Sequence, residues 1–310
     1  MILTRSEWLP EYQRHQRRVE EQTQAHLERR AAGKRHPVWD FMFTYYPTTP
    51  GQLSHWSPGC NTTLLDVRDD ELTHLKFFTR TKDAAGDADS AVLSKSATLA
   101  FNAAAYNEKR GKSRDFISAL LRKTQANPTQ FNCFGLHEWA MVYRETPRHP
   151  EPLRLGAAGT NQVVEDHSIK CTHYDAYRFF TKAARPLNAN TPSRATQPEF
   201  EQPGCLHANM DLYKWASKFG EIIPGELWLD CFELACDVRQ LDMEASPYDL
   251  AEWGFRPVAI ETKAGKAEYV ARQRALAVRA AELRVRLLEF ADSSTAGAPT
   301  ANPDKSSPTS

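Results

Sequence analysis

Residues 130–144 read QFNCFGLHEWAMVYR, and the rest of the chain must build around this stretch. Its apolar residues recur at the i, i+3, i+4 and i+7 spacing of one helix face: Leu136, Trp139, Ala140 and Tyr143. Gly135 permits a sharp turn just before that helix. His137 and Glu138 fall in its first turn, off the apolar stripe, where the helix dipole favours a carboxylate. The pattern predicts a core-anchored helix that presents a His–Glu pair either to an active site or to a buried polar network.

The composition is that of a folded protein. The 310 residues are 41% hydrophobic and 10% aromatic, which is enough to form a core. The N-terminal residues, MILTRSEWLPEYQRH, carry charges from Arg5 onward and lack the apolar segment of a secretory signal. No apolar run approaches the roughly 20 residues that a transmembrane helix needs. We expect a single compact globular domain in the cytoplasm, without membrane association.

Six cysteines are spread along the chain: Cys60, Cys133, Cys171, Cys205, Cys231 and Cys236. No two of them form a C-x-x-C pair, and only the last two lie close together in sequence. This spacing argues against a zinc ribbon or a redox motif. We expect buried thiols, and we predict neither a metal ion nor another cofactor.

Charge is distributed unevenly, although the formal net charge is zero. Residues 109–123 contain six basic residues and one acid, and residues 176–198 contain four basic residues and no acid. Residues 201–261 contain twelve acids and four basic residues. The basic segments can form a positive groove for nucleic acid, or they can be ordinary solvated faces. On the first interpretation, the phosphate-binding candidates are Lys109, Arg110, Lys112, Arg114, Arg178 and Lys214.

Hydrophobic periodicity and turn residues predict a mainly α-helical protein with a few short β-strands, an α+β fold. Besides the helix at 136–143, the predicted helices span residues 6–34, 91–107, 114–125, 172–180, 206–219, 225–244 and 263–290. The predicted strands span residues 61–67 and 75–79, paired as a hairpin, and residues 163–170. The basic sequence KRGKSR lies between two of these helices, where a loop and a helix start can contact phosphate.

Composition also divides the chain into parts. Residues 1–35 are predicted to form a charged N-terminal helical cap, and residues 36–291 a catalytic domain. Residues 292–310 are rich in small and polar residues, and we expect a disordered tail. Residues 83–90 are small, polar and acidic, which predicts a flexible loop.

A histidine lies near a carboxylate at four places: His36 with Asp40, His137 with Glu138, His173 with Asp175, and His207 with Asp211. The last pair is spaced i, i+4 in CLHANMDLYKWASKF, residues 205–219. On a helix, one face of this sequence is apolar and another carries a polar stripe of His207, Asp211, Lys214 and Lys218. Such a stripe suits a site, and it also suits a solvent-exposed face. Because the helix at 136–143 has the same design, we predict that the two helices form facing walls of one pocket.

Five stretches carry a resemblance to a known family: FTYY (43–46), FNCFGLHEWAMVYR (131–144), THYDAYRFF (172–180), EQPGCLHANMDLYKWA (201–216) and LDMEASPYDL (241–250). They resemble a family of actinobacterial proteins named 3-methyladenine DNA glycosylases, and the similarity spans residues 36–273. Members of this kind have also been linked to defence against phages with modified cytosine. The resemblance implies a glycosylase that removes an alkylated purine or a hypermodified cytosine, such as glucosylated hydroxymethylcytosine, from double-stranded DNA. Its role is then DNA repair or antiviral defence.

The chemistry of such a reaction assigns roles by residue type. Cleavage of an N-glycosidic bond passes through an oxocarbenium-like sugar that needs a carboxylate, and the leaving base needs a proton donor. From spacing, the predicted catalytic residues are Asp211, Glu138, His137 and His207. A base rotated out of the duplex needs an aromatic and polar pocket, for which the candidates are Tyr45, Tyr46, Asn209, Asp175, His173 and Phe179. For the aromatic residues, packing in the core is the alternative interpretation. We expect the enzyme to act as a monomer.

Two other functions fit the same residues. Pairs of histidine and carboxylate are good ligands for divalent metals, which suits a metal-dependent hydrolase. The basic residues of segment 109–123 suit a nucleic-acid-binding protein without catalytic activity. Within a glycosylase, Lys214 has two open roles, a phosphate contact or a Schiff-base nucleophile that adds lyase activity.

Overall fold

The computed structural model describes residues 1–82, 96–147 and 149–295, and within them helices predominate over one small sheet. The longer helices are α1 (Arg5–Ala31), α4 (Ala103–Ala126), α6 (Gly156–Glu165), α10 (Leu212–Phe219), α11 (Gly225–Glu244) and α12 (Lys263–Ser293). The short ones are α2 (Phe41–Thr44), α3 (Pro50–Leu53), α5 (Leu136–Ala140), α7 (Tyr174–Tyr177), α8 (Gln197–Phe200) and α9 (Leu206–Met210). Turns of 3₁₀ helix cover Arg185–Leu187, Gly220–Ile222 and Ala251–Trp253. The predicted fold class, mainly α with a few short strands, is confirmed.

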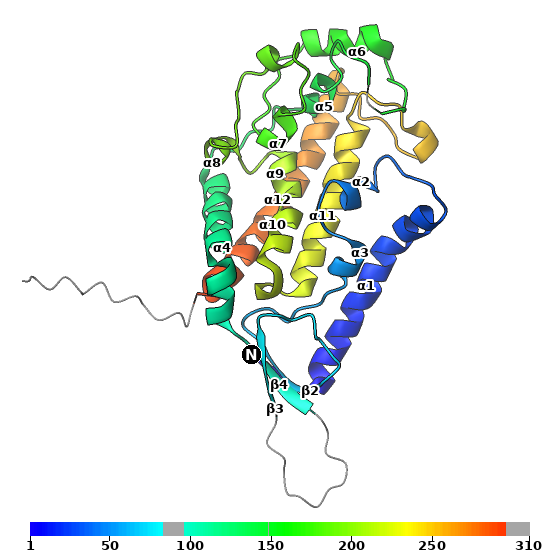
Figure 1. Ribbon diagram of the computed structural model, residues 1–310. Helices are drawn as coiled ribbons and strands as arrows, with labels where there is room; N and C mark the ends of the chain where they lie inside the picture. The colour runs from blue at the N-terminus through cyan, green and yellow to red at the C-terminus, as the bar shows by residue number, and fades with distance from the viewer. Residues whose placement is uncertain (83–95, 148, 296–310) are drawn as a thin grey trace, which may run out of the picture.

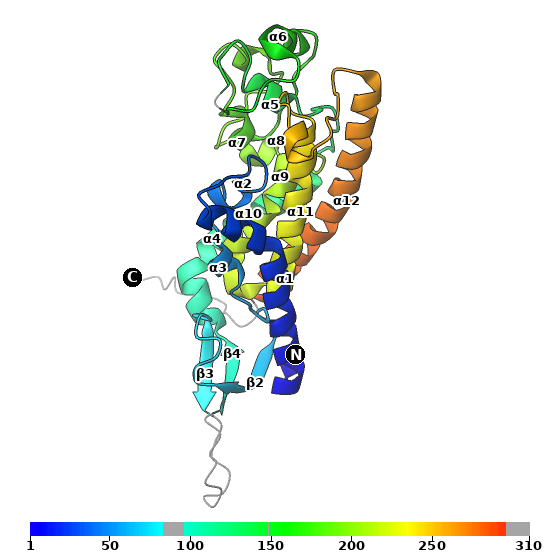
Figure 2. The ribbon, with the colours of Figure 1, turned by 90° about the vertical axis from the view of Figure 1, so that its right-hand side faces the viewer.

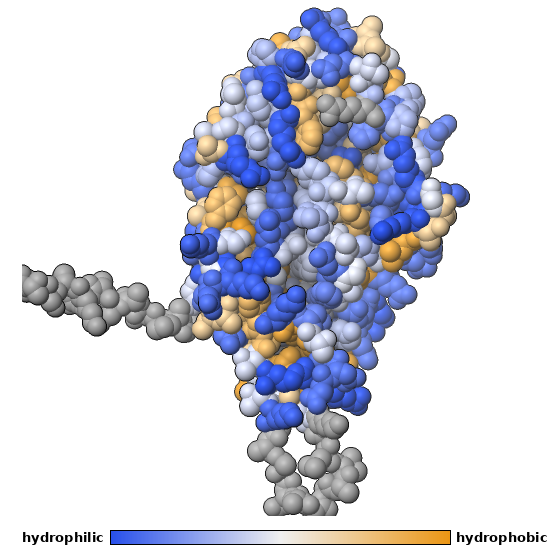
Figure 3. All heavy atoms as spheres, in the orientation of Figure 1, coloured by the Kyte–Doolittle hydropathy of each residue, from blue (hydrophilic) through white to orange (hydrophobic). Residues whose placement is uncertain are grey.

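Helix α11 lies at the centre of a helical bundle. It packs against α1, α9, α10 and α12, and its residues Leu227, Leu234 and Leu241 are fully buried. Figures 1 and 2 show the sheet at one end of the bundle and the short helices α5 and α7, with α6, at the other. On the face drawn in Figure 3, hydrophilic side chains surround several smaller apolar areas. Among the described residues, no helix combines the length and apolarity needed to cross a membrane.

The sheet has the strand order β1-β2-β4-β3. Its strands are β1 (Ile2–Leu3), β2 (Thr63–Arg68), β3 (Phe78–Lys82) and β4 (Ser96–Phe101). β1 runs parallel to β2, whereas β2 and β3 each pair antiparallel with β4. The predicted hairpin between the strands near 61–67 and 75–79 is therefore wrong, because β4 lies between them.

Strand β4 also contradicts the helix predicted at 91–107. Ala97 and Leu99 alternate into the core with the two-residue period of a strand. The helix begins only after Asn102, whose side chain accepts a hydrogen bond from the backbone N–H of Ala105 at 3.0 Å. Short apolar runs are ambiguous between strand and helix, which explains the error.

Helix α4 runs unbroken through KRGKSR, so the predicted junction between two helices at this point is wrong. Gly111 weakens helix propensity by about 1 kcal/mol relative to alanine, but Tyr106 and Ile117 on either side anchor the helix in the core. Arg114 is buried, and its guanidinium binds the side chains of Asn107 and Ser294. Contrary to prediction, Arg114 therefore lies in the interior and not on a phosphate-binding loop.

Other elements differ from prediction in extent. The helices at 6–34, 225–244 and 263–290 are confirmed, and α11 has the predicted bounds. The strand predicted at 163–170 is wrong, because Thr160, Val163 and Val164 are buried at the helical spacing of α6. The helix predicted at 172–180 is confined to α7, and the one at 206–219 is interrupted at Asp211, which ends α9 and begins α10. Residues 296–310 of the predicted tail and the predicted loop at 83–90 lie outside the described residues.

Helix α1 covers the bundle along one narrow buried stripe of Trp8, His15, Val19, Thr23 and His26. Its contact with α11 is strengthened by Arg18, whose guanidinium lies 3.1 Å from Asp230 and 2.9 Å from Glu233. Arg18 contacts the N-terminal half of α11. The C-terminal half of α11 instead contacts the short helices α2 and α5, and α11 also packs against α9.

Candidate active site

Gly135 sets the direction of α5. Its φ of +71° lies in the left-handed region, and a Cβ at this position would meet Ala245 and Tyr269 at 3.3 Å. Both the backbone conformation and the packing therefore require glycine. The predicted apolar stripe is confirmed, since Leu136, Trp139, Ala140 and Tyr143 are all buried. The helix is shorter than predicted and ends at Ala140.

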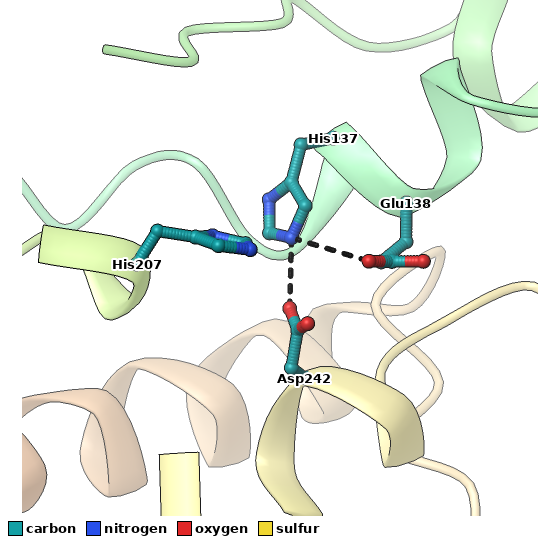
Figure 4. A group of neighbouring side chains, drawn as sticks. All are labelled: His137, Glu138, His207 and Asp242. Atoms are coloured by element: carbon teal, nitrogen blue, oxygen red, sulfur yellow. Dashed lines mark hydrogen bonds and ion pairs between the residues drawn. The ribbon is translucent and has the colours of Figure 1, made fainter. Parts of the chain in front are cut away.

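His137 is held by Asp242, which comes from α11. The imidazole Nε2 lies 2.7 Å from Asp242 Oδ1, and both side chains are almost fully buried. Burial disfavours the imidazolium, but the charge of Asp242 more than offsets this and raises the pKa of His137 well above its ordinary value. Burial opposes the ionised form of Asp242 too, yet His137 holds the pKa of this carboxyl well below its ordinary value. The two residues form a buried ion pair (Figure 4).

Glu138 approaches the same imidazole nitrogen of His137 as Asp242 does. Its Oε1 is 4.0 Å from His137 Nε2 and 3.9 Å from Arg239 Nη1. Burial, together with the negative charge of Asp242, raises the pKa of Glu138. Asp242 has the closer cationic partner, which explains why the pKa values of the two carboxyls shift in opposite directions. Two neighbouring carboxyls with pKa values pushed apart are typical of acid–base sites.

His207 joins this cluster to a second one. Its ring lies 4.5 Å from the ring of His137 and 5.3 Å from that of His173, centroid to centroid. Burial and the positive charge of His137 lower the pKa of His207 to about 3, so this imidazole is neutral at pH 7. The predicted facing walls are confirmed at this point, because His137 from α5 and His207 from α9 are in contact (Figure 4).

The second cluster lies behind His207. His173 Nε2 is 3.3 Å from Glu201 Oε1 and 3.4 Å from Asp211 Oδ2, and all three side chains are buried. Despite the opposing effect of burial, Lys214 and His173 hold the pKa of Asp211 well below its ordinary value. Lys214 contacts Asp211 directly.

A pocket of about 220 Å³ opens over the first cluster. Its apolar lining consists of Phe41, Tyr45, Met141, Val142, Ala176, Phe179 and Tyr248, and its polar lining of Glu138, His149, Asp175, His207 and Arg239. Glu138 and Asp175 thus bring two carboxylates to one cavity. Asp175 lies 3.4 Å from Lys214 Nζ and 3.2 Å from Arg178 Nε, so two cations compensate its negative charge.

One wall of the pocket is a stack of π systems. The guanidinium of Arg239 lies 4.0 Å from the centre of the Phe41 ring. The Phe41 and Tyr45 rings stack at 4.7 Å with an interplanar angle of 10°. On another part of the lining, Arg178 covers the Phe179 ring at 4.5 Å. Flat, partly charged walls of this kind suit a planar, polar ligand.

The five stretches that carry the family resemblance meet at this pocket. FTYY supplies Tyr45, THYDAYRFF supplies Asp175 and Phe179, EQPGCLHANMDLYKWA supplies His207, and LDMEASPYDL supplies Tyr248. FNCFGLHEWAMVYR supplies Glu138 together with the two apolar residues that follow its helix. Segments separated by more than two hundred positions thus build a single cavity.

Other predicted site residues lie outside the pocket lining. Tyr46 is buried, and its hydroxyl donates to Asp211 at 3.3 Å. Asn209 is fully buried and uses its amide internally, accepting from Arg284 at 2.7 Å and donating to the carbonyl of Pro203 at 2.9 Å. The structure therefore places Tyr46 and Asn209 in the supporting core, contrary to their predicted contact with substrate. His173 and Asp211 are buried too, and neither belongs to the pocket lining.

The basic candidates divide between two regions. Arg178 and Lys214 lie beside the pocket through their contacts with Asp175. Lys109, Arg110 and Lys112 are exposed on α4, near the end of the bundle that carries the sheet.

Three important residues were not predicted from the sequence: Asp242, Arg239 and Glu201. Asp242 and Glu201 belong to stretches that carry the resemblance, and their signal is a charged residue in a largely buried segment. Arg239 and Asp242 are spaced i, i+3 on α11, and their side chains lie 3.4 Å apart. Arg239 is the one basic residue of α11, whose other charged residues are all acids, and its i, i+3 spacing from Asp242 is the signal in the sequence. The predicted pair of His36 with Asp40 is structural, because Asp40 binds His26 and Arg29 as well as the His36 backbone.

Three of the cysteines lie behind the histidines. Cys133, Cys171 and Cys205 line a small enclosed cavity that also contacts His137 and His173. Burial raises the pKa of Cys205 to about 12 and also raises that of Cys171 well above its ordinary value, so these two are neutral thiols. All six cysteines are free.

Comparison with known proteins finds no matching family model, no matching curated protein and no matching solved structure.

Proposed function

We propose that this chain is a DNA N-glycosylase that removes a modified base and leaves an abasic site. The observation that carries the proposal is the convergence of the five resembling stretches on one aromatic pocket with two carboxylates. The reaction class comes from the resemblance to 3-methyladenine DNA glycosylases. The proposed substrate base is a hypermodified phage cytosine or an alkylated purine. The protein acts as a cytoplasmic monomer on double-stranded DNA, in repair or antiviral defence.

The proposed reaction begins with a base rotated into the pocket. Its ring stacks against Tyr45, in line with the Phe41 ring and the Arg239 guanidinium. Glu138, whose pKa is raised by burial, donates a proton to the leaving base as the C1′–N bond breaks. The electron pair of that bond leaves with the base, and the sugar becomes an oxocarbenium ion.

The second half of the reaction uses the other carboxylate. Asp175, ionised beside two cations, stabilises the positive sugar and takes a proton from the water that adds to C1′. The sequence predicts Asp211 as a catalytic group, but Asp211 is buried outside the pocket lining, so we assign it a positioning role. It positions Lys214, which in turn contacts Asp175. His137 and Asp242 hold α5 on α11 and keep Glu138 at the pocket.

Alkali treatment tests the proposal directly. Duplexes that carry an alkylated purine or glucosylated hydroxymethylcytosine are incubated with the purified protein and then heated in alkali, which breaks the strand at abasic sites. We expect breaks at the modified position only. Intact strands from both kinds of duplex contradict the proposal.

A second candidate, a metal-dependent hydrolase, is favoured by one observation. His137, Glu138, His207 and Asp242 each offer a ligand atom, and these atoms all lie within 4.8 Å of one another. Two histidines and two carboxylates suit a divalent cation such as Zn²⁺ or Mn²⁺. We rank it second because Asp242 already has compensating partners in His137 and Arg239. Stoichiometric metal in the purified protein, with activity lost to a chelator and restored by the metal, would favour the hydrolase.

A further inference from the structure

A second cavity, of about 300 Å³, lies at the end of the bundle nearer the sheet. It is bounded by α3, α4, α10 and the segment that leads into β3. Three exposed cations line it, Lys76, Arg110 and Lys218. Among the residues that the structure describes, none of the three lies within ion-pair distance of a carboxylate, whereas most arginines near the first pocket are paired. The cavity thus gathers three cations against a single carboxyl, that of Glu221.

The one acid in the cavity does not reverse this balance. Glu221 accepts hydrogen bonds from the backbone N–H groups of Lys76 at 2.8 Å and Phe77 at 2.7 Å. Burial raises its pKa, whereas these two hydrogen bonds and the charges of Lys76 and Arg110 act in the opposite direction. His55 and His74 stack at 4.8 Å, and burial lowers the pKa of both, so they offer flat aromatic surface and no charge at pH 7.

Helix α10 connects this cavity to the first pocket. Lys214 contacts Asp175 in the lining of the pocket, and Lys218 lines the second cavity. The two lysines are four residues apart and therefore share one helix face, separated by about 6 Å along the axis. A chain of phosphates that leaves the pocket along α10 reaches the cavity within a few nucleotides, since phosphates of one strand repeat about every 3.4 Å along B-DNA.

We propose that the cavity lined by Lys76, Arg110 and Lys218 binds phosphates of the DNA strand whose base enters the pocket. This inference rests on the proposed function. On this path the DNA strand runs from the pocket along α10 towards the sheet. The chemistry is charge neutralisation without base recognition, which holds and orients the strand and carries no sequence information.

Binding of unmodified DNA tests the strand path without any catalysis. The affinity of the full chain for a fluorescein-labelled, unmodified duplex is measured by anisotropy between about 50 and 200 mM salt. The test variant is Lys76→Gln/Arg110→Gln/Lys218→Gln. The matched control is Arg17→Gln/Arg30→Gln/Lys263→Gln, which removes three exposed cations from α1 and the start of α12. Thermal melting checks that each variant is folded.

We expect the slope of log affinity against log salt to fall by about two to three in the test variant, because each lost phosphate contact removes about 0.9. Affinity at low salt should fall on the order of tenfold or more, and the control should match the wild type. Equal slopes in the test variant and the wild type overturn the strand path. Thermal melting is also measured with and without inorganic phosphate. If phosphate stabilises the wild type but not the cavity variant, and the two bind DNA equally, the cavity binds free phosphate and the strand path is overturned.

The two proposals fail separately. Base release by the wild type, together with a salt slope unchanged in the cavity variant, overturns the strand path alone. A reduced slope, together with no base release from any modified duplex, overturns the glycosylase and leaves a DNA-binding surface.

Discussion

His137 Nε2 lies 2.7 Å from Asp242 Oδ1, although the two residues are 105 positions apart in sequence. The contact joins α5 to α11, and the exposed fractions of the two side chains are only 2% and 1%. Each charge is compensated chiefly by the other, with Arg239 as a third partner. Because Glu138 follows His137 in the same short helix, this ion pair also fixes the carboxyl that faces the pocket.

The first prediction concerns this ion pair. Asp242→Asn removes the carboxylate that lies nearest to the buried imidazolium of His137, which we expect to lower the free energy of unfolding by about 3–5 kcal/mol. The control is Asp237→Asn on the same helix, which breaks a half-exposed pair with Arg279 and should change stability by about 0–1 kcal/mol. Urea unfolding monitored by circular dichroism measures both. Equal losses for the two variants would show that the buried pair is not a structural support.

The second prediction is a pH dependence that originates in His207. Its folded pKa of about 3 lies below the ordinary value, which is near 6.5 in an unfolded chain. Between these values the unfolded chain binds a proton that the folded chain does not, so stability falls as pH falls. From pH 6.5 to 5.0 the wild type should therefore lose about 2 kcal/mol relative to His207→Asn. His137 and His173 do not mask this difference, because both are present in the wild type and in His207→Asn, so their contribution is common to the two stability curves.

Urea unfolding of the wild type and of His207→Asn at several pH values supplies the measurement. Parallel stability curves would mean that His207 carries a proton in the folded state. The contact between His207 and the imidazolium of His137 would then need another explanation.

The third prediction separates backbone strain from packing. Gly135→Ala and Gly33→Ala both place a Cβ at a left-handed φ, +71° and +64°, which costs about 1–2 kcal/mol in each case. At Gly135 the new Cβ also meets Ala245 and Tyr269, whereas at Gly33 nothing lies within 4 Å. We expect Gly135→Ala to be the more destabilising by a further 1–3 kcal/mol or so. Thermal and urea unfolding of both variants measure the difference, and equal effects would contradict the packing described around α5.

The fourth prediction addresses the proton donor. Glu138→Gln keeps the shape of the side chain but removes the proton that the leaving base requires, so single-turnover base release should slow by about 10²–10⁴-fold. DNA binding should stay close to that of the wild type. Glu145→Gln, an exposed acid seven residues further on, is the matched control and should keep full activity. A Glu138→Gln rate within about twofold of the wild type would remove Glu138 from the mechanism.

Parts of the fold could be predicted because their patterns are local. The apolar stripe from Leu136 to Tyr143 and the helix at 225–244 follow directly from helical periodicity, and both are confirmed. The facing of His137 and His207 was predicted from two stripes of the same design, and the 4.5 Å between their rings confirms it. Strand β4 could not be recognised, because the pairing that stabilises Ser96–Phe101 comes from β2 and β3.

The candidate site was only partly predictable for the same physical reason. A spacing rule finds partners on one helix, but Asp242 meets His137 across the bundle, and Glu201 meets His173 from a separate segment. The i, i+4 relation of His207 and Asp211 was a sound clue to a shared helix face, yet the interruption at Asp211 sends His207 to the pocket and Asp211 to the interior. Burial, which the sequence does not encode locally, decides which carboxyl can meet a substrate.

The most direct test of the central claim is the identity of the product. Duplexes that contain 3-methyladenine, glucosylated hydroxymethylcytosine or only unmodified bases are incubated side by side with the wild type and with Glu138→Gln, and the released small molecules are identified by mass. We predict that the wild type releases one free modified base, that unmodified DNA yields none, and that Glu138→Gln releases the same base far more slowly. Failure of the wild type to release any free base from the modified duplexes would contradict the account.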